Sequence, residues 1–222
     1  MKGKHLMIIA ILAIIVLMGT IIFKQYKNSK RANVKIPILL YHDFVTTVPD
    51  SDPDNFNYIN TPQSFEENIE TLLEKGNTFI SMEELYNAYN GKKELPEKPI
   101  LINMDDGYYS NYEYIYPILK KYNVKASIFV VTDKVGKEVN GKKYLGWDEC
   151  KEMQESGIVE IFSHSKRHVF YDRLSARTIR DDVIESYKTI EEKLGNKDLK
   201  VFAYPYGAST KETVWGAKNK WN

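Results

Sequence analysis

The chain has 222 residues, enough for one ordinary domain and a short appendage. Its 43% apolar and 27% charged residues are typical of a globular protein, and its formal net charge is +1 at pH 7. The lysines and arginines of residues 1–31 have no acid among them, so the rest of the chain is mildly acidic, which argues against nucleic acid as a partner. The single cysteine, Cys150, excludes an internal disulfide and a cysteine-based zinc site.

The first predicted element is a transmembrane helix. Residues 6–23 carry no charge, and a helix of this length is about 27 Å long, close to the thickness of the hydrocarbon core of a bilayer. No small-residue cleavage site follows, so an uncleaved anchor is favoured over a removed signal peptide. We expect a membrane anchor at 1–23, a polar linker at 24–35 and a globular domain at 36–222. The basic residues after residue 23 outnumber those before residue 6, a bias that by itself would place this domain in the cytoplasm.

Strands and helices alternate along the globular domain. Thr61 is predicted to cap a helix that ends at Gly76, and Ser81 with Glu84 forms a capping-box pair for a second, shorter helix. The predicted strands are 36–41, 99–104, 126–131, 158–162 and 199–204, and further helices are expected at 110–123, 147–156, 175–194 and from 210 onward. The strands are continuous apolar runs, which indicates a parallel sheet covered by helices. Such sheets place functional residues at the carboxyl ends of their strands.

Polar motifs follow four of these strands. His42 comes after the first strand, the pair Asp105-Asp106 with Gly107 after the second, the run SHSKRH at 163–168 after the fourth, and YPYG at 204–207 after the last. Each motif alone is more typical of a turn, a surface loop or a histidine satisfied within a core. Their shared position at strand ends favours a functional site.

Two histidines and a carboxylate are a common set of metal ligands, and three protein ligands leave a position open for water in catalytic zinc sites. The same set suits iron(II) or cobalt, so the residues leave the identity of the metal open. A cation would also explain the two adjacent acids. One acid can bind the cation while the other stays ionised and accepts a proton from attacking water.

These motifs resemble those of the polysaccharide deacetylases with NodB homology, carbohydrate esterase family four. NMDDG at 103–107 resembles the family's (T/S)FDDG, HSKRH at 164–168 matches H(S/T)xxH in full, and AYPYG at 203–207 matches RxPYG in part. The resemblance covers the chain from about residue 36. It implies a distorted (β/α) barrel, here incomplete and preceded by one transmembrane helix.

The resemblance also implies roles for individual residues. Asp105 would be the base, and the backbone N–H of Tyr206 would donate to the oxyanion. The implied cofactor is a divalent metal, zinc first, with cobalt, nickel or iron as alternatives. Its implied ligands are Asp106, His164 and His168.

The sequence departs from the family pattern in three places, and the third is its last stretch, residues 211–222, which looks like a helix cut short before the strand that should follow it. Ala203 stands where the third motif often has an arginine that holds the base. The late L-x-H motif with the catalytic acid is missing after Gly207, but Leu40-Tyr41-His42 is an L-x-H near the start. The poly-N-acetylglucosamine deacetylases of biofilm type, which this sequence resembles more closely, are circularly permuted and use an early histidine as acid. This implies that His42 protonates the leaving amine, with Asp43 or another acid tuning it; a structural role for His42 is the alternative.

The expected function is metal-dependent hydrolysis of N-acetyl groups from a cell-surface polysaccharide, with release of acetate. Poly-N-acetylglucosamine is the first expected substrate and peptidoglycan the second. Because enzymes of this kind act on polymers outside the cytoplasm, we expect a single-pass membrane protein with its catalytic domain outside. The alternative is a truncated, non-catalytic remnant that binds metal or glycan, which the short stretch after Gly207 suggests.

Overall fold

The computed structural model describes residues 16–20, 35–47 and 59–209, and the chain divides into two units, Met1–Ile36 and Pro37–Asn222. In the first unit, residues 16–20 are helical and exposed. Within the described ranges, no helix is long and apolar enough to cross a membrane. The predicted anchor and linker lie mostly outside these ranges, as does the predicted helix from residue 210 onward.

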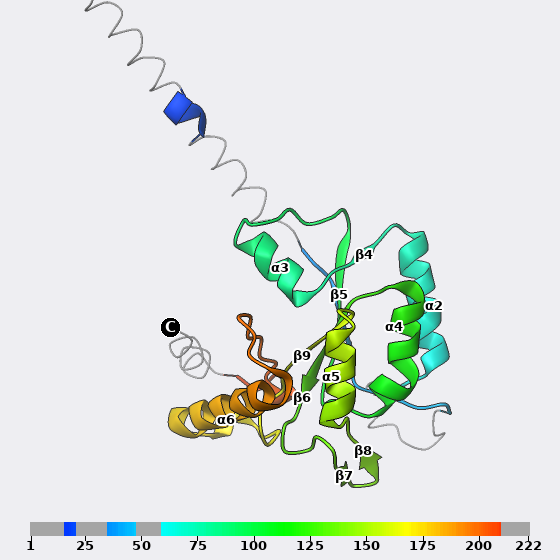
Figure 1. Ribbon diagram of the computed structural model, residues 1–222, viewed down its shortest axis with the longest axis vertical. Helices are drawn as coiled ribbons and strands as arrows, with labels where there is room; N and C mark the ends of the chain where they lie inside the picture. The colour runs from blue at the N-terminus through cyan, green and yellow to red at the C-terminus, as the bar shows by residue number, and fades with distance from the viewer. Residues whose placement is uncertain (1–15, 21–34, 48–58, 210–222) are drawn as a thin grey trace, which may run out of the picture. The chain divides into compact units, whose positions relative to one another are not determined.

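A parallel sheet forms the centre of the second unit (Figure 1). Its strands follow the order β1 (Ile38–Tyr41), β5 (Pro99–Met104), β6 (Ala126–Val130) and β9 (Val159–Ser163). A further short strand, β4 (Thr78–Phe79), pairs with the start of β5, and every pairing in this sheet is parallel. The predicted α/β class with a parallel sheet is therefore confirmed.

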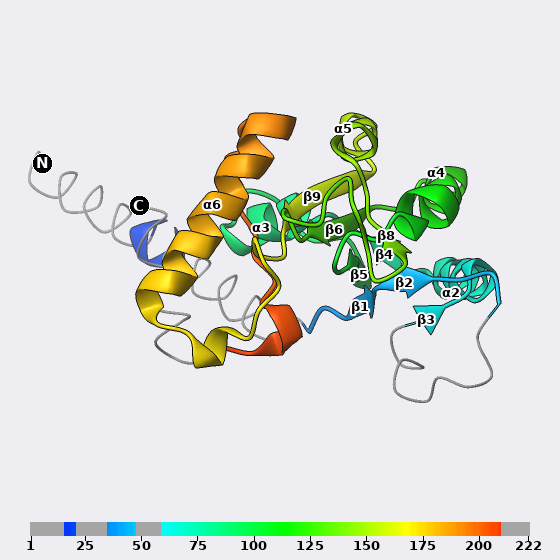
Figure 2. The same ribbon diagram turned by 90° about the horizontal axis from the view of Figure 1, so that it is seen from below.

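Five described helices accompany these strands. They are α2 (Pro62–Glu74), α3 (Met82–Tyr89), α4 (Tyr116–Tyr122), α5 (Trp147–Glu155) and α6 (Ala176–Leu194). Thr61 caps α2 by accepting a hydrogen bond from the Ser64 N–H, and Ser81 and Glu84 form the predicted capping box of α3. Helices α2 and α4 lie side by side, joined by hydrogen bonds from Lys121 and Tyr122 to Glu66, while α5 and α6 pack beside β9 (Figures 1 and 2).

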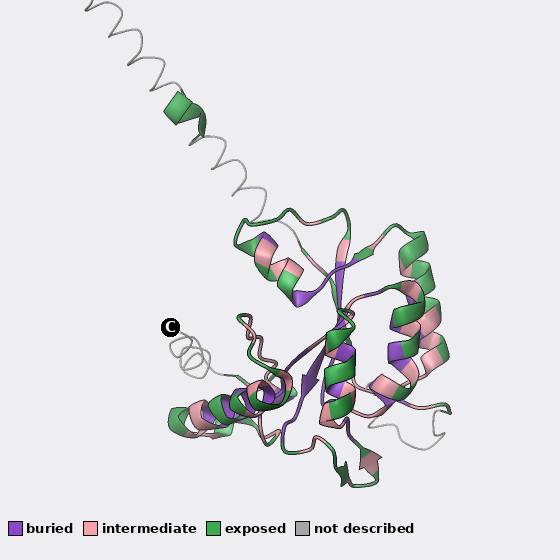
Figure 3. Cartoon of the chain, in the orientation of Figure 1, coloured by how far each residue is buried: buried purple, intermediate pink, exposed green. Residues whose placement is uncertain are grey.

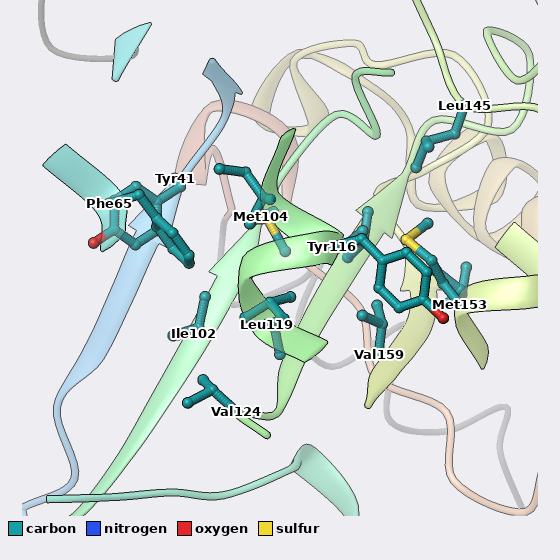
Figure 4. Packing of buried hydrophobic residues seen from close by; sticks show 14 of the residues in the cluster. Tyr41, Phe65, Ile102, Met104, Tyr116, Leu119, Val124, Leu145, Met153 and Val159 are labelled. Carbon is teal, nitrogen blue, oxygen red and sulfur yellow. The ribbon is translucent and has the colours of Figure 1, made fainter. Parts of the chain in front are cut away.

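Buried apolar side chains from the strands meet those of α2, α4 and α5 in the main core. Figure 3 shows the buried residues along the central strands and on one side of these helices. Ile102, Ile128 and Ile161 continue this core across three neighbouring strands and are at most 1% exposed. Tyr41 and Phe65 meet edge to face with ring centroids 5.1 Å apart (Figure 4). Cys150 is buried in the same core, as expected for a cysteine packed on a helix.

Some elements differ from the predictions. Within the ranges that the structure describes, the predicted strand 199–204 forms a single parallel bridge, between Phe202 and Ser163, because the turn at Pro205–Gly207 soon takes the chain away from β9. The predicted helix 110–123 begins with a π-helical turn, η1 (Asn111–Ile115), before α4. Five two-residue strands in the described part of the chain were too short to predict from pattern: β4 and, in addition, β2 (Asp43–Phe44), β3 (Ile59–Asn60), β7 (Glu138–Val139) and β8 (Lys142–Lys143).

Candidate functional site

The two adjacent acids lie at the carboxyl end of β5. The Asp105 N–H donates to the Tyr41 carbonyl (2.9 Å), which extends the pairing with β1, and both carboxylates are buried. Asp106 and Gly107 then take left-handed conformations with φ of 70° and 76°. A Cβ atom on Gly107 would lie 2.9 Å from Cγ1 of Val130, so this turn requires glycine for space as well as for conformation.

The two histidines of the HSxxH motif lie beyond the end of β9. The His164 N–H donates to the Val130 carbonyl (2.9 Å), so His164 continues the pairing of β9 with β6. Ser165 and His168 both have positive φ, 75° and 56°, and the Ser165 hydroxyl accepts a hydrogen bond from the His168 N–H (2.8 Å). This tight loop turns both imidazoles toward the acids.

The structure brings together the three residues predicted as metal ligands. Asp106, His164 and His168 each place one ligand atom within 4.8 Å of the others. Nε2 of His168 lies 3.0 Å from Oδ1 of Asp106, and Nε2 of His164 lies 3.8 Å from the same atom. Imidazole nitrogen and carboxylate oxygen are ligands that zinc and iron(II) accept, so these residues fit a divalent cation.

The fourth member of the group is Asp105, whose Oδ2 lies 3.8 Å from Nε2 of His164. Its other oxygen, Oδ1, is buried and has no hydrogen-bond partner in the described part of the chain. Buried carboxylate oxygens normally have a partner, so this atom is suited to a group that joins the site, such as a water molecule.

The two acids have opposite pKa shifts. Burial, and then the charge of Asp106, raises the pKa of Asp105 to about 7. Burial acts in the same direction on Asp106, but the contact with His168 and the charges of His168, His164 and Lys134 outweigh it, and they lower its pKa to about 2. Two adjacent carboxyls with separated pKa values suit two roles, one as a permanent anion and one as a proton acceptor near neutral pH.

His164 is held as a neutral imidazole. Burial lowers its pKa to about 4. Its Nδ1 lies 3.0 Å from the Ala203 carbonyl oxygen, and a carbonyl can only accept, so Nδ1 carries the proton. The lone pair of Nε2 therefore faces the acids, as a metal ligand requires. The contact with His164 is made by the backbone carbonyl of residue 203, so it does not require the arginine side chain that the family often has at this position.

His42, the predicted acid, follows β1 and is half-buried. Burial lowers its pKa, the charge of Asp106 opposes that shift, and the charge of His168 adds to it. His42 thus lies within electrostatic range of the cluster. Asp106 is an acid whose charge raises the pKa of His42, and the Asp43 carboxylate accepts hydrogen bonds from Ser110 and Lys142.

Tyr206 lies in the turn Pro205–Gly207 with φ of 60°. Its ring stacks on Phe170 with centroids 3.8 Å apart and an interplanar angle of 8°, and it lies 4.6 Å from the ring of His168. The YPYG turn therefore reaches the histidine loop. The oxyanion role of its N–H stays a prediction.

Sequence reasoning missed two residues beside the site, Phe170 and Asp182. Phe170 gave no signal, since a lone aromatic residue in a loop has no pattern. Asp182 could have been found from the sequence. It lies three residues after Ile179 and next to Val183, within the apolar stripe of α6, and a buried acid at such a position needs a partner.

Two acids and two histidines thus lie together at the ends of parallel strands, and comparison with known proteins identifies the family. Residues 92–220, more than half of the chain, match the family profile described as polysaccharide deacetylase. The chain belongs to this family.

The chain is also similar to individual proteins. YxkH of Bacillus subtilis (strain 168) is 30% identical over 185 residues, which cover 83% of this chain and 61% of that protein. Poly-β-1,6-N-acetyl-D-glucosamine N-deacetylase of Staphylococcus aureus (strain MSSA476) is 32% identical over 162 residues, 68% of this chain and 54% of that protein. The chain thus spans between half and two thirds of the length of these curated relatives. Among solved structures, the Streptococcus pyogenes deacetylase PplD in complex with acetate matches with a TM-score of 0.73 and 27% identity, covering 84% of this chain and 80% of that one.

Proposed function

We propose that this chain hydrolyses N-acetyl groups of a polysaccharide, releasing acetate and leaving a free amine on the sugar. The observation that carries the proposal is the buried Asp105 carboxylate, one oxygen of which has no hydrogen-bond partner among the described residues, beside the cluster of Asp106, His164 and His168. Poly-N-acetylglucosamine is the proposed substrate, because the Staphylococcus aureus relative is named for it.

Asp106, His164 and His168 would hold a divalent cation, with zinc as the first choice and cobalt, nickel or iron as alternatives. When bound, such a cation polarises the amide carbonyl and lowers the pKa of the attacking water. The low pKa of Asp106 and the neutral His164 keep both in the protonation state of a ligand at neutral pH.

Asp105 serves as the base. Water forms a bond to the amide carbon while Asp105 accepts one of its protons, a role that suits a buried carboxylate beside the ligand cluster. The Tyr206 N–H donates to the oxygen that becomes negative. The bond between carbon and nitrogen then breaks, and His42 supplies the proton that the departing amine needs.

We further propose that residues 1–23 anchor the chain in a membrane with the domain outside the cytoplasm. The uncharged run at residues 6–23 supports the anchor, and a cell-surface polymer as substrate supports the orientation. Protease treatment of intact cells tests the orientation, and complete protection of residues 36–222 would reverse it.

The activity is tested by measuring acetate released from N-acetylglucosamine oligomers by the full chain, after chelation and again after zinc is added. Release should require the metal and be lost in Asp105→Asn. The control is Asp172→Asn, which removes a charge of the same kind from an exposed position. A folded chain that binds zinc and releases no acetate would instead support the non-catalytic remnant.

A further inference from the structure

The carboxylate of Asp182 on α6 is completely buried and accepts three hydrogen bonds. Oδ1 accepts from the Lys166 N–H (2.9 Å) and the Tyr171 hydroxyl (2.7 Å), and Oδ2 accepts from Nε of Arg167 (2.6 Å). Two of these donors are the middle residues of the HSxxH motif. Asp182 thus binds the loop that carries both histidines, although it contacts neither imidazole in any described interaction.

The loop between the histidines needs such support. Ser165 and His168 are both left-handed and neither is glycine, a conformation that costs on the order of 1–3 kcal/mol for each residue. Conformations of this kind persist only where the surroundings hold them. Lys166 and Arg167 lie between the two left-handed residues, and Asp182 holds both.

A second bond from α6 supports the same segment. Ser186 lies one helical turn after Asp182, and its hydroxyl is 2.6 Å from that of Ser163, which in turn accepts a hydrogen bond from the Ser165 N–H (3.1 Å). Tyr171, Ile179 and Val183 bury this face of α6. One face of α6 therefore holds the segment on either side of His164.

We propose that Asp182 is a positioning residue for the proposed metal site: its three hydrogen bonds hold the 165–168 loop in the strained form that places His168 beside Asp106. The inference rests on the proposed metal site. According to this inference, α6 contributes to the affinity of the site for its metal although none of the three proposed ligands lies on this helix. Loss of a group that orients a metal ligand typically weakens metal binding by about 10–100-fold.

The test is a Co²⁺ titration of the full chain, followed by visible absorption, with affinities obtained by competition against a chelator. Asp182→Asn keeps the shape of the side chain but loses the charge that pairs with Arg167. We expect it to bind Co²⁺ at least about 10-fold more weakly and with an altered absorption spectrum. Asp181→Asn is the matched control, because Asp181 is the neighbouring residue of α6 but is half-exposed and pairs with Arg180. It should bind Co²⁺ as the wild type does.

Tyr171→Phe is the second variant. It removes one donor to Asp182 while keeping the ring, and we expect a few-fold weaker affinity for Co²⁺. Wild-type affinity and spectrum in Asp182→Asn would overturn the inference, as would an equal loss in Asp181→Asn. If Asp182→Asn does not fold, wild-type affinity in Tyr171→Phe would overturn it. Failure of the wild-type chain to bind Co²⁺ would overturn the metal site itself, and the role of Asp182 with it.

Discussion

The side-chain amide of Asn111 donates a hydrogen bond to the backbone carbonyl of His42 (2.9 Å). Asn111 is fully buried and begins the π-helical turn η1, shortly after the two acids. π-Helical turns are frequent at functional sites. This bond holds His42, which follows β1, against the segment that follows β5. The same segment begins with Asp105 and Asp106, so the position of His42 is tied to that of the two acids.

His42→Gln should lower the rate of acetate release by about 10²–10⁴-fold, the usual cost of removing a general acid. Affinity for Co²⁺ should stay within a few-fold of wild type, because His42 is not in the ligand set. Release rates and Co²⁺ titrations of the same preparation check both expectations. A rate within a few-fold of wild type would assign His42 a structural role.

Gly107→Ala should destabilise the fold more than Gly157→Ala. Both glycines have positive φ, 76° and 73°, so alanine is strained at each. At position 157 the new methyl group meets no atom of the described residues within 4 Å, whereas at 107 it overlaps Val130. Overlap of this kind costs about 1–3 kcal/mol beyond the strain. Urea unfolding of the two variants measures the difference, and Val130→Ala should recover part of it in the Gly107→Ala background. Equal losses in the two single variants would contradict this account.

Glu160→Ala should lower the free energy of unfolding by about 2 kcal/mol. The carboxylate lies on β9 and accepts hydrogen bonds from the first N–H groups of α3, those of Met82 (2.7 Å) and Glu83 (3.1 Å), and from the Ser127 hydroxyl (3.1 Å). Without it these donors lose their acceptor. Glu155→Ala, at an exposed position of α5, is the control in the same urea titration and should change stability little. A loss at 160 no larger than at 155 would contradict the capping role.

Cys150 should not react with an aromatic disulfide reagent at pH 8 until the chain unfolds. Burial, and then the charge of Glu149, raises the pKa of its thiol from 9.0 to about 12, and only the thiolate is nucleophilic. Because the pKa is higher in the folded chain, the unfolded chain loses this proton first. Stability should therefore fall as the pH rises between about 9 and 12. Rapid labelling of the folded chain at pH 8 would show that the thiol is accessible.

Local chemistry made much of this fold predictable. The caps at Thr61 and Ser81 act on residues three positions away, so the sequence alone specifies where α2 and α3 begin. Candidate site residues could be named because parallel strands end at one edge of a sheet, where motifs after separate strands converge, and because those motifs resemble a known family, which implied their roles. Asp105, Asp106, His164 and His168 meet there as predicted.

The rest depends on contacts between distant segments. The two-residue strands exist only because a partner lies beside them, as Thr78 lies beside Pro99. The stack of Phe170 on Tyr206 joins two loops that no periodicity links. The left-handed conformation of Ser165 could not be predicted, because serine rarely adopts it. The contacts that support this loop come from α6, which lies later in the chain. The membrane anchor, the metal and the polysaccharide stay predictions.

The pairing of β1 with β5 has a consequence for how the protein is made. Ile38 lies opposite Leu101, so β1 leaves the ribosome well before its partner in the sheet exists. Contacts this distant along the chain form slowly, and apolar strands that wait for a partner are prone to misassembly. Ile38 and Leu40 remain about half exposed even after pairing. His42, which follows this strand, therefore reaches the acids only after β5 has been synthesised, and no nascent chain shorter than that can have a complete site.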